Sequence, residues 1–146
     1  MKVEIQIDPQ APEPRAIIIT PSMTDQLAEK IKQLSSDEPH RLTGNREDHW
    51  ELLEEEEIIR IYAQQGKVTA VTPKGSYHLR QRLYELEERL NPHWFVRISH
   101  SEIIHLKHVK RFDVSLAGTV CISLSNGETA YASRRYVSKI KQILGI

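Results

Sequence analysis

Alternation between apolar and polar residues marks most of this chain as a series of short extended segments. Residues 2–8 alternate strictly, with Val3, Ile5 and Ile7 on one side, which is typical of a half-buried strand. Residues 16–20 are continuously apolar and predict a second strand, buried on both faces. Further strands are predicted at residues 49–53, 58–63, 67–73, 76–79, 95–98, 108–113, 119–124 and 129–132, with a short extended or helical piece at 102–106.

Three segments instead repeat their apolar residues every three to four positions, as amphipathic helices do. The first is predicted to begin at Ser22, which forms a capping-box-like pair with Asp25, and to end within residues 35–39. The second covers residues 80–90 and the third residues 134–144. Their predicted buried positions are Met23, Leu27, Ile31 and Leu34; Leu83, Leu86 and Leu90; and Val137, Ile140 and Leu144.

Turn residues separate the predicted strands. Gly66 and the pair Asn126–Gly127 are typical of tight hairpins, and residues 42–48 predict a turn flanked by short strands. Composition shifts near Asp48, so we expect an N-terminal strand–strand–helix extension, residues 1–48, followed by the main domain, residues 49–146.

Charge is distributed unevenly along the chain. Residues 93–146 hold 8 Lys and Arg against 3 Asp and Glu, whereas residues 1–92 hold 12 against 17. A basic half suits a face that binds a polyanion, although attraction between the two halves within the fold explains the pattern equally well.

The composition indicates a globular protein without a membrane span or a secretory signal. Hydrophobic residues make up 39% of the chain, and no apolar run approaches the ~20 residues that a spanning helix needs. The single cysteine, Cys121, allows no internal disulfide and is expected to be a buried thiol. These features favour a cytoplasmic protein.

No arrangement of residues suggests catalysis or a bound metal. Nucleophile-elbow, phosphate-loop and dinucleotide motifs are absent from the sequence. His105 and His108 are expected on opposite faces of an extended segment, which disfavours a zinc site. The carboxylates of residues 54–57 are expected to form a solvated turn.

Basic side chains at predicted turns point instead to nucleic acid. Arg134 and Arg135 stand where a strand becomes a helix, His100 and Lys67 stand on turns, and Arg80 lies near a helix start. An arginine offers two parallel donors to guanine, but a lone Arg-Arg pair is a plain surface feature in most proteins.

The segment from about residue 52 to 146 resembles the LytTR-type DNA-binding domain of bacterial transcription regulators. Its order and spacing of short motifs match that family over about two thirds of the chain. The shared landmarks are residues 55–59 (EEEII), 64–67 (QQGK), 83–88 (LYELEE), 95–104 (FVRISHSEII), 126–128 (NGE) and 133–136 (SRRY).

The resemblance implies a mostly β fold, α+β overall, of small antiparallel sheets with short helices. It also implies that loop residues enter successive major grooves of double-stranded DNA, with two copies on repeated half-sites. The family's base-contacting positions fall on His100, where asparagine is common, on Arg135, and near Gly66. A glycine cannot read a base, so Lys67 or Gln65 is expected to serve there, or the contact is lost. Phosphate contacts are expected from Arg134, Ser101, Arg80 and Lys107.

Many family members carry a phosphorylated receiver domain, for which residues 1–48 are too short. This chain is similar to the stand-alone type, in which a short extension is expected to serve dimerisation. Some such regulators are held by a small membrane protein, so a membrane-bound antagonist is a candidate partner. The expected protein is a homodimeric DNA-binding regulator without a cofactor, metal or small-molecule substrate. The alternative is a non-catalytic interaction module whose basic half docks an acidic protein.

Overall fold

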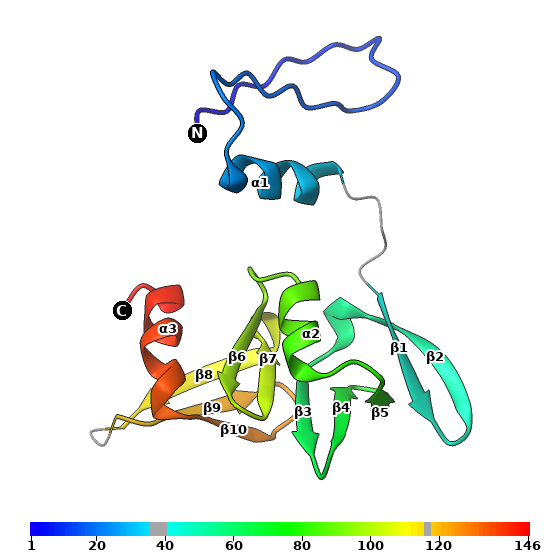
Figure 1. Ribbon diagram of the computed structural model, residues 1–146, viewed down its shortest axis with the longest axis vertical. Helices are drawn as coiled ribbons and strands as arrows, with labels where there is room; N and C mark the ends of the chain where they lie inside the picture. The colour runs from blue at the N-terminus through cyan, green and yellow to red at the C-terminus, as the bar shows by residue number, and fades with distance from the viewer. Residues whose placement is uncertain (36–40, 116–117) are drawn as a thin grey trace. The chain divides into compact units, whose positions relative to one another are not determined.

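A computed structural model of the chain describes residues 1–35, 41–115 and 118–146, shown in Figure 1. The chain divides into two compact units, Met1–Glu38 and Pro39–Ile146. The boundary predicted at residue 48 falls in the turn between strands β1 and β2, both of which belong to the second unit.

Within residues 1–35 of the N-terminal unit the structure forms one helix, α1 (Asp25–Ser35), which confirms the first predicted helix. The helix begins three residues later than predicted, and the capping pair of Ser22 and Asp25 is wrong. Thr24 caps it instead, because its Oγ1 accepts a hydrogen bond of 3.2 Å from the Leu27 amide. Met23 and Leu34 of the predicted buried stripe are exposed.

The two strands predicted in residues 1–20 are wrong. Neither segment takes part in a strand ladder, and Val3, Ile5 and Ile7 are 78%, 87% and 86% exposed. Residues 16–20, predicted to be buried on both faces, are also largely exposed. Alternation gives an extended segment one apolar face, but a strand also requires a neighbouring backbone.

The second unit is built on a seven-stranded antiparallel sheet. Most of its strands begin and end within two residues of the predicted positions. The strands in spatial order are β2 (His49–Glu54), β1 (Arg41–Arg46), β5 (Gly75–Leu79), β4 (Lys67–Thr72), β3 (Arg60–Gln64), β7 (Glu102–His105) and β6 (Phe95–Ser99). Gln65 and Gly66 join β3 to β4 with positive φ of 52° and 77°, which is the two-residue turn that a glycine permits.

A three-stranded antiparallel sheet and two helices complete this unit. The sheet has the order β10 (Thr129–Ala132), β9 (Val120–Leu124) and β8 (Val109–Val114). Helix α3 (Arg134–Leu144) has its predicted bounds, whereas α2 (Leu83–Arg89) begins later than residue 80. Arg82 is extended and caps α2, its amide donating to the Glu85 carboxylate at 3.4 Å. The mostly β fold class is confirmed.

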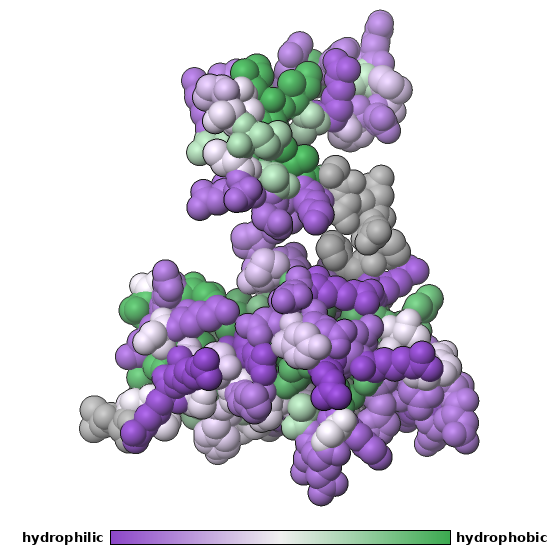
Figure 2. Space-filling view, viewed as in Figure 1, coloured by the Kyte–Doolittle hydropathy of each residue, from purple (hydrophilic) through white to green (hydrophobic). Residues whose placement is uncertain are grey.

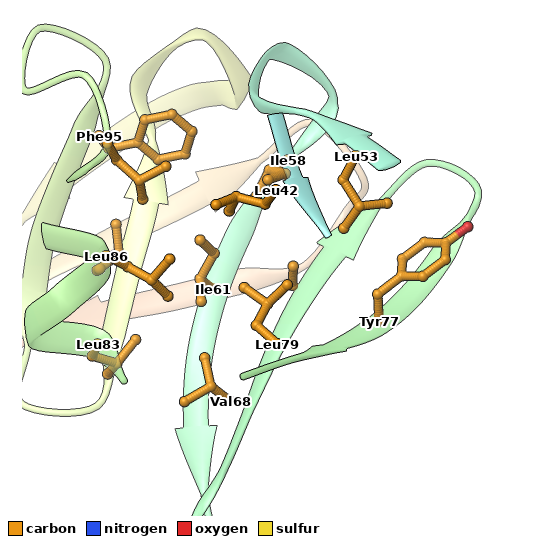
Figure 3. Close-up of a cluster of buried hydrophobic side chains, with 13 residues drawn as sticks. Leu42, Leu53, Ile58, Ile61, Val68, Tyr77, Leu79, Leu83, Leu86 and Phe95 are labelled. Atoms are coloured by element: carbon orange, nitrogen blue, oxygen red, sulfur yellow. The ribbon is translucent and has the colours of Figure 1, made fainter. Parts of the chain in front are cut away.

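Two apolar clusters hold the second unit together. In one, α2 packs on the large sheet, and Figure 3 shows Leu83 and Leu86 directed toward Ile61 and Leu79. In the other, α3 packs with β6 and the small sheet through Val137 and its neighbours. Burial of each leucine or isoleucine side chain stabilises the fold by about 1.5–3 kcal/mol. The predicted inward faces of α2 and α3 therefore hold these helices against the sheets.

Three local expectations are corrected by the structure. Glu55 is buried, 6% exposed, in the 3-10 turn Glu55–Glu57, so the acidic run is not a fully solvated turn. His105 and His108 are not on opposite faces, because the 3-10 turn Leu106–His108 brings their ring centroids to 5.1 Å. Cys121 is only half-buried.

Candidate nucleic-acid interface

The order of strands brings two predicted contact loops to the same end of the large sheet. β3 pairs antiparallel with both β4 and β7, so the β3–β4 turn lies beside the β6–β7 turn. The Ala63 amide donates a hydrogen bond of 2.8 Å to the Ser101 carbonyl. Gln65 and Lys67 on one turn are therefore held beside His100 on the other, and all three side chains are exposed.

The third loop, which joins β10 to α3, lies at the same end of the large sheet. The Ser133 amide donates to the Ile98 carbonyl at 2.9 Å, which fixes the start of α3 beside the end of β6. Arg134 and Arg135 are the first two residues of α3, and both are exposed. A helix N-terminus favours anions, so two cations there gain from a polyanion placed against them.

Arg80 reaches this end of the sheet through the β4–β5 register. Leu79 pairs with Val68, so Arg80 directly follows β5 at the end where Lys67 begins β4. Its guanidinium carbon lies 4.8 Å from the centroid of the Trp50 ring. This cation–π contact orients the exposed arginine while leaving its donors available to a phosphate.

Lys107 is not brought together with the other candidates. It lies in the turn that follows β7, with its Nζ 4.2 Å from the centroid of the Trp94 ring. Trp94 precedes β6, and the His100 turn follows β6. Lys107 therefore lies at the opposite end of the sheet from His100.

Arg97 supports the His100 loop, a role that the sequence did not reveal. Its side chain is 11% exposed, and its guanidinium donates to the carbonyls of Ser99 (3.1 Å) and His100 (2.6 Å). A third contact, 2.8 Å, pairs it with Glu87 of α2. The sequence contains this arginine in the Phe-x-Arg motif, but only the fold shows that its side chain bonds the turn that follows its own strand.

Glu102, which follows the His100 loop, forms a mostly buried ion pair with Arg60. Glu102 accepts a hydrogen bond of 2.6 Å from Arg60, and both side chains are mostly buried. Burial raises the pKa of Glu102, although the Arg60 charge opposes that change. Arg60 also contacts Glu128 of the β9–β10 turn at 3.1 Å. Arg60 of the large sheet is thereby linked to the small sheet.

The histidine pair contributes to packing near the end of β7. His105 is 2% exposed and contacts Phe95 and His108 edge-on, and its Nδ1 accepts from the Lys107 amide at 3.1 Å. Burial, with smaller effects from His108 and Lys107, lowers the pKa of His105 to about 4. Within residues 1–35, 41–115 and 118–146, no group of three or more His, Cys, Asp or Glu side chains is placed to hold a metal ion.

Comparison with known proteins identifies the family. Residues 48–145 match the profile of the LytTr DNA-binding domain. This chain belongs to that family. LytTR domains are DNA-binding domains of regulators and are not a class of enzymes.

Related chains support this assignment. Two Staphylococcus aureus proteins, from strains MSSA476 and MW2, each named "Uncharacterized HTH-type transcriptional regulator", are 31% identical over 147 residues. Each match covers 100% of this chain and 99% of the relative, so it spans the LytTR domain and the N-terminal unit.

The fold has a counterpart among solved structures. The LytTr DNA-binding domain of a putative methyl-accepting/DNA response regulator from Bacillus cereus superposes with a TM-score of 0.71 at 23% identity. The match covers 73% of this chain and 98% of that domain. Among the described residues, no helix has the length and apolar character required to cross a membrane.

Proposed function

We propose that this protein regulates transcription by reading the major groove of double-stranded DNA, as a dimer on repeated half-sites. The DNA-binding domain comprises residues 49–146 together with strand β1, which pairs with β2, and the residues before β1 form an extension that serves dimerisation. The observation that carries the proposal is that three exposed loops are tied side by side through main-chain hydrogen bonds at Ser101 and Ser133. Rigid loops that present cations and amides together are suited to base edges.

Each exposed side chain has a role that suits its chemistry. Arg135 and Lys67 donate to guanine, Gln65 suits adenine, and the imidazole of His100 contacts a base edge from the middle loop. Phosphates are bound by the side chains that flank these positions, which are Arg134, Ser101 and Arg80. Lys107 is left out of this set because it lies at the far end of the sheet.

The test begins with selection of bound sequences from random duplexes by the full chain. On the selected site, Arg135→Ala should weaken binding by about 1–3 kcal/mol and relax the choice of one base pair. The matched control is Arg111→Ala. Arg111 is an exposed arginine on β8, in the register of Ser123, away from the start of α3. A titration by gel shift on matched and mismatched duplexes measures both effects.

Three results would reject the proposal. The first is equal affinity of the wild-type chain for all duplexes, which would favour the docking of an acidic protein by the basic half. The second is an Arg135→Ala variant that keeps wild-type affinity and base preference. The third is loss of binding in both Arg135→Ala and Arg111→Ala, which would show a general charge effect and would remove the base-reading role.

A further inference from the structure

The N-terminal unit presents a row of β-branched side chains to solvent. Val3, Ile5 and Ile7 alternate with polar residues and are all exposed, and Ile17 and Ile19 of the second segment are 74% and 95% exposed. Figure 2 shows apolar surface gathered on this unit. Single exposed apolar residues are normal in soluble proteins, but three at a period of two form one complete face of a strand.

The backbone of residues 2–7 is also unpaired, and only the Asp8 carbonyl at the end of the segment accepts a backbone hydrogen bond. In the described part of this unit, the backbone hydrogen bonds outside the body of α1 are Ala11 N–H to Asp8 C=O, 3.1 Å, and Ala28 N–H to Thr24 C=O, 2.9 Å. Neither joins residues 2–8 to residues 16–20. Free amides and carbonyls along an extended apolar segment form the edge to which another strand adds.

The order of side chains in residues 2–8 suits pairing with an identical segment. If two copies pair antiparallel about Ile5, each Val3 lies opposite an Ile7 and each Lys2 lies opposite an Asp8. Apolar residues then share one face and opposite charges meet at both ends. Parallel pairing in register would instead place Lys2 against Lys2 and Asp8 against Asp8.

We propose that residues 2–8 bind the same segment of a second copy of this chain, as an antiparallel two-stranded ribbon centred on Ile5. A second copy is the occupant because the charges match under two-fold rotation. Lys2 lies 3.4 Å from Glu4 in an exposed ion pair and exchanges it on association. An isolated two-stranded ribbon is marginal in water, and the exposed Ile17 and Ile19 widen the apolar face that stabilises it.

This surface would join the two copies of the proposed dimer, and in that respect the inference rests on the proposed function. The two ideas are tested separately. Self-association is measured without DNA, and DNA recognition by a single copy is measured on one half-site. A chain that self-associates but does not discriminate between DNA sequences would contradict the proposed function alone. A chain that recognises a half-site but stays monomeric would contradict the pairing of residues 2–8 alone.

The experiment measures the dimer dissociation constant of the full chain by sedimentation equilibrium. Lys2→Asp and Asp8→Lys each place like charges opposite each other at both ends, and each should raise this constant about tenfold. The double variant restores opposite charges and should return to the wild-type value. A mixture of the two single variants should form heterodimers in preference to homodimers, because both facing pairs are then opposite in charge.

Ile5→Glu, which brings two carboxylates together at the two-fold axis, should abolish association. Gln10→Glu adds the same charge outside the segment and should change nothing. All variants should keep wild-type affinity for a single half-site, which shows that they fold. A wild-type chain that is monomeric at tens of micromolar, or charge exchange without rescue, would overturn the inference. So would dissociation by Ile19→Glu but not by Ile5→Glu, since the contact would then belong to residues 16–20.

Discussion

Arg134 and Arg135 are adjacent in sequence but have different tasks in the proposed complex. Both occupy the first turn of α3, where the helix dipole disfavours a positive charge. Arg135 Cζ lies 5.9 Å from the Tyr136 ring centroid, which restrains that side chain for directional contact with a base. Arg134 has the simpler role of a phosphate contact.

Arg134→Ala should therefore weaken binding to all duplexes by a similar factor. The slope of log affinity against log salt concentration should fall by about one, because one fewer counterion is released. Fluorescence anisotropy across a salt series measures the slope, with Arg111→Ala as the control. An unchanged slope would contradict the phosphate contact.

A second prediction at the residue scale concerns His105 and acid stability. Its pKa is about 4 in the folded protein against 6.5 for the ordinary side chain, so only the unfolded chain binds this proton between those values. The free energy of unfolding should thus fall as pH decreases from about 6.5 toward 4, by up to about 1.4 kcal/mol per pH unit. Above about pH 6.5 neither the folded nor the unfolded chain binds this proton, so His105 no longer lowers the free energy of unfolding.

The measurement is denaturant unfolding at several pH values between about 5 and 7. His105→Phe should flatten the slope, because the variant has no group there to titrate. The matched control for the substitution itself is His93→Phe, which replaces an exposed histidine. A His105→Phe slope equal to that of the wild type would show that other groups govern acid stability.

At the scale of elements, the β6–β7 turn depends on an arginine from its own strand. Arg97→Lys keeps the charge but loses the planar fork that bonds the Ser99 and His100 carbonyls together. Specific DNA affinity should fall about tenfold while affinity for random duplex stays the same, because the loop is less well ordered but no phosphate contact is removed. Competition gel shifts measure the two affinities. Equal loss of both would contradict a positioning role.

Secondary structure was predictable where sequence patterns and tertiary partners agree. In residues 41–146 period-two runs become strands, and turns such as Gln65–Gly66 fall where expected. The same pattern in residues 2–8 gave a wrong strand, because periodicity cannot show whether a neighbouring backbone exists. His105 and His108 came together because three residues of 3-10 turn interrupt an apparently extended run.

At the scale of the whole molecule, assembly of the site was not predictable from local patterns. Which loops share an end depends on strand order, and only the pairing of β3 with β7 places Ser101 beside Ala63. The family resemblance supplied that grouping for His100 and Arg135. The resemblance also suggested Lys107. This lysine follows β7, whereas the His100 turn precedes β7, so the length of β7 separates Lys107 from the other candidate residues.

The dimer proposed for the whole molecule predicts a dependence on half-site spacing. Two copies that read the same face of the duplex need half-sites a whole number of turns apart, about 10.5 base pairs or a multiple. Insertion of about five base pairs should reduce affinity for the paired site to that for a single half-site, since simultaneous engagement is lost. Gel shifts on a spacing series measure this. Equal affinity at all spacings would contradict paired binding.

The hydrogen bonds that align the three loops come from peptide groups at Ala63, Ser101, Ile98 and Ser133, and not from the side chains at the loop tips. The tips can therefore be replaced without loosening the scaffold beneath them. A regulator built in this way can acquire a different set of target genes by single substitutions, each altering one position of its preferred sequence while the others are kept.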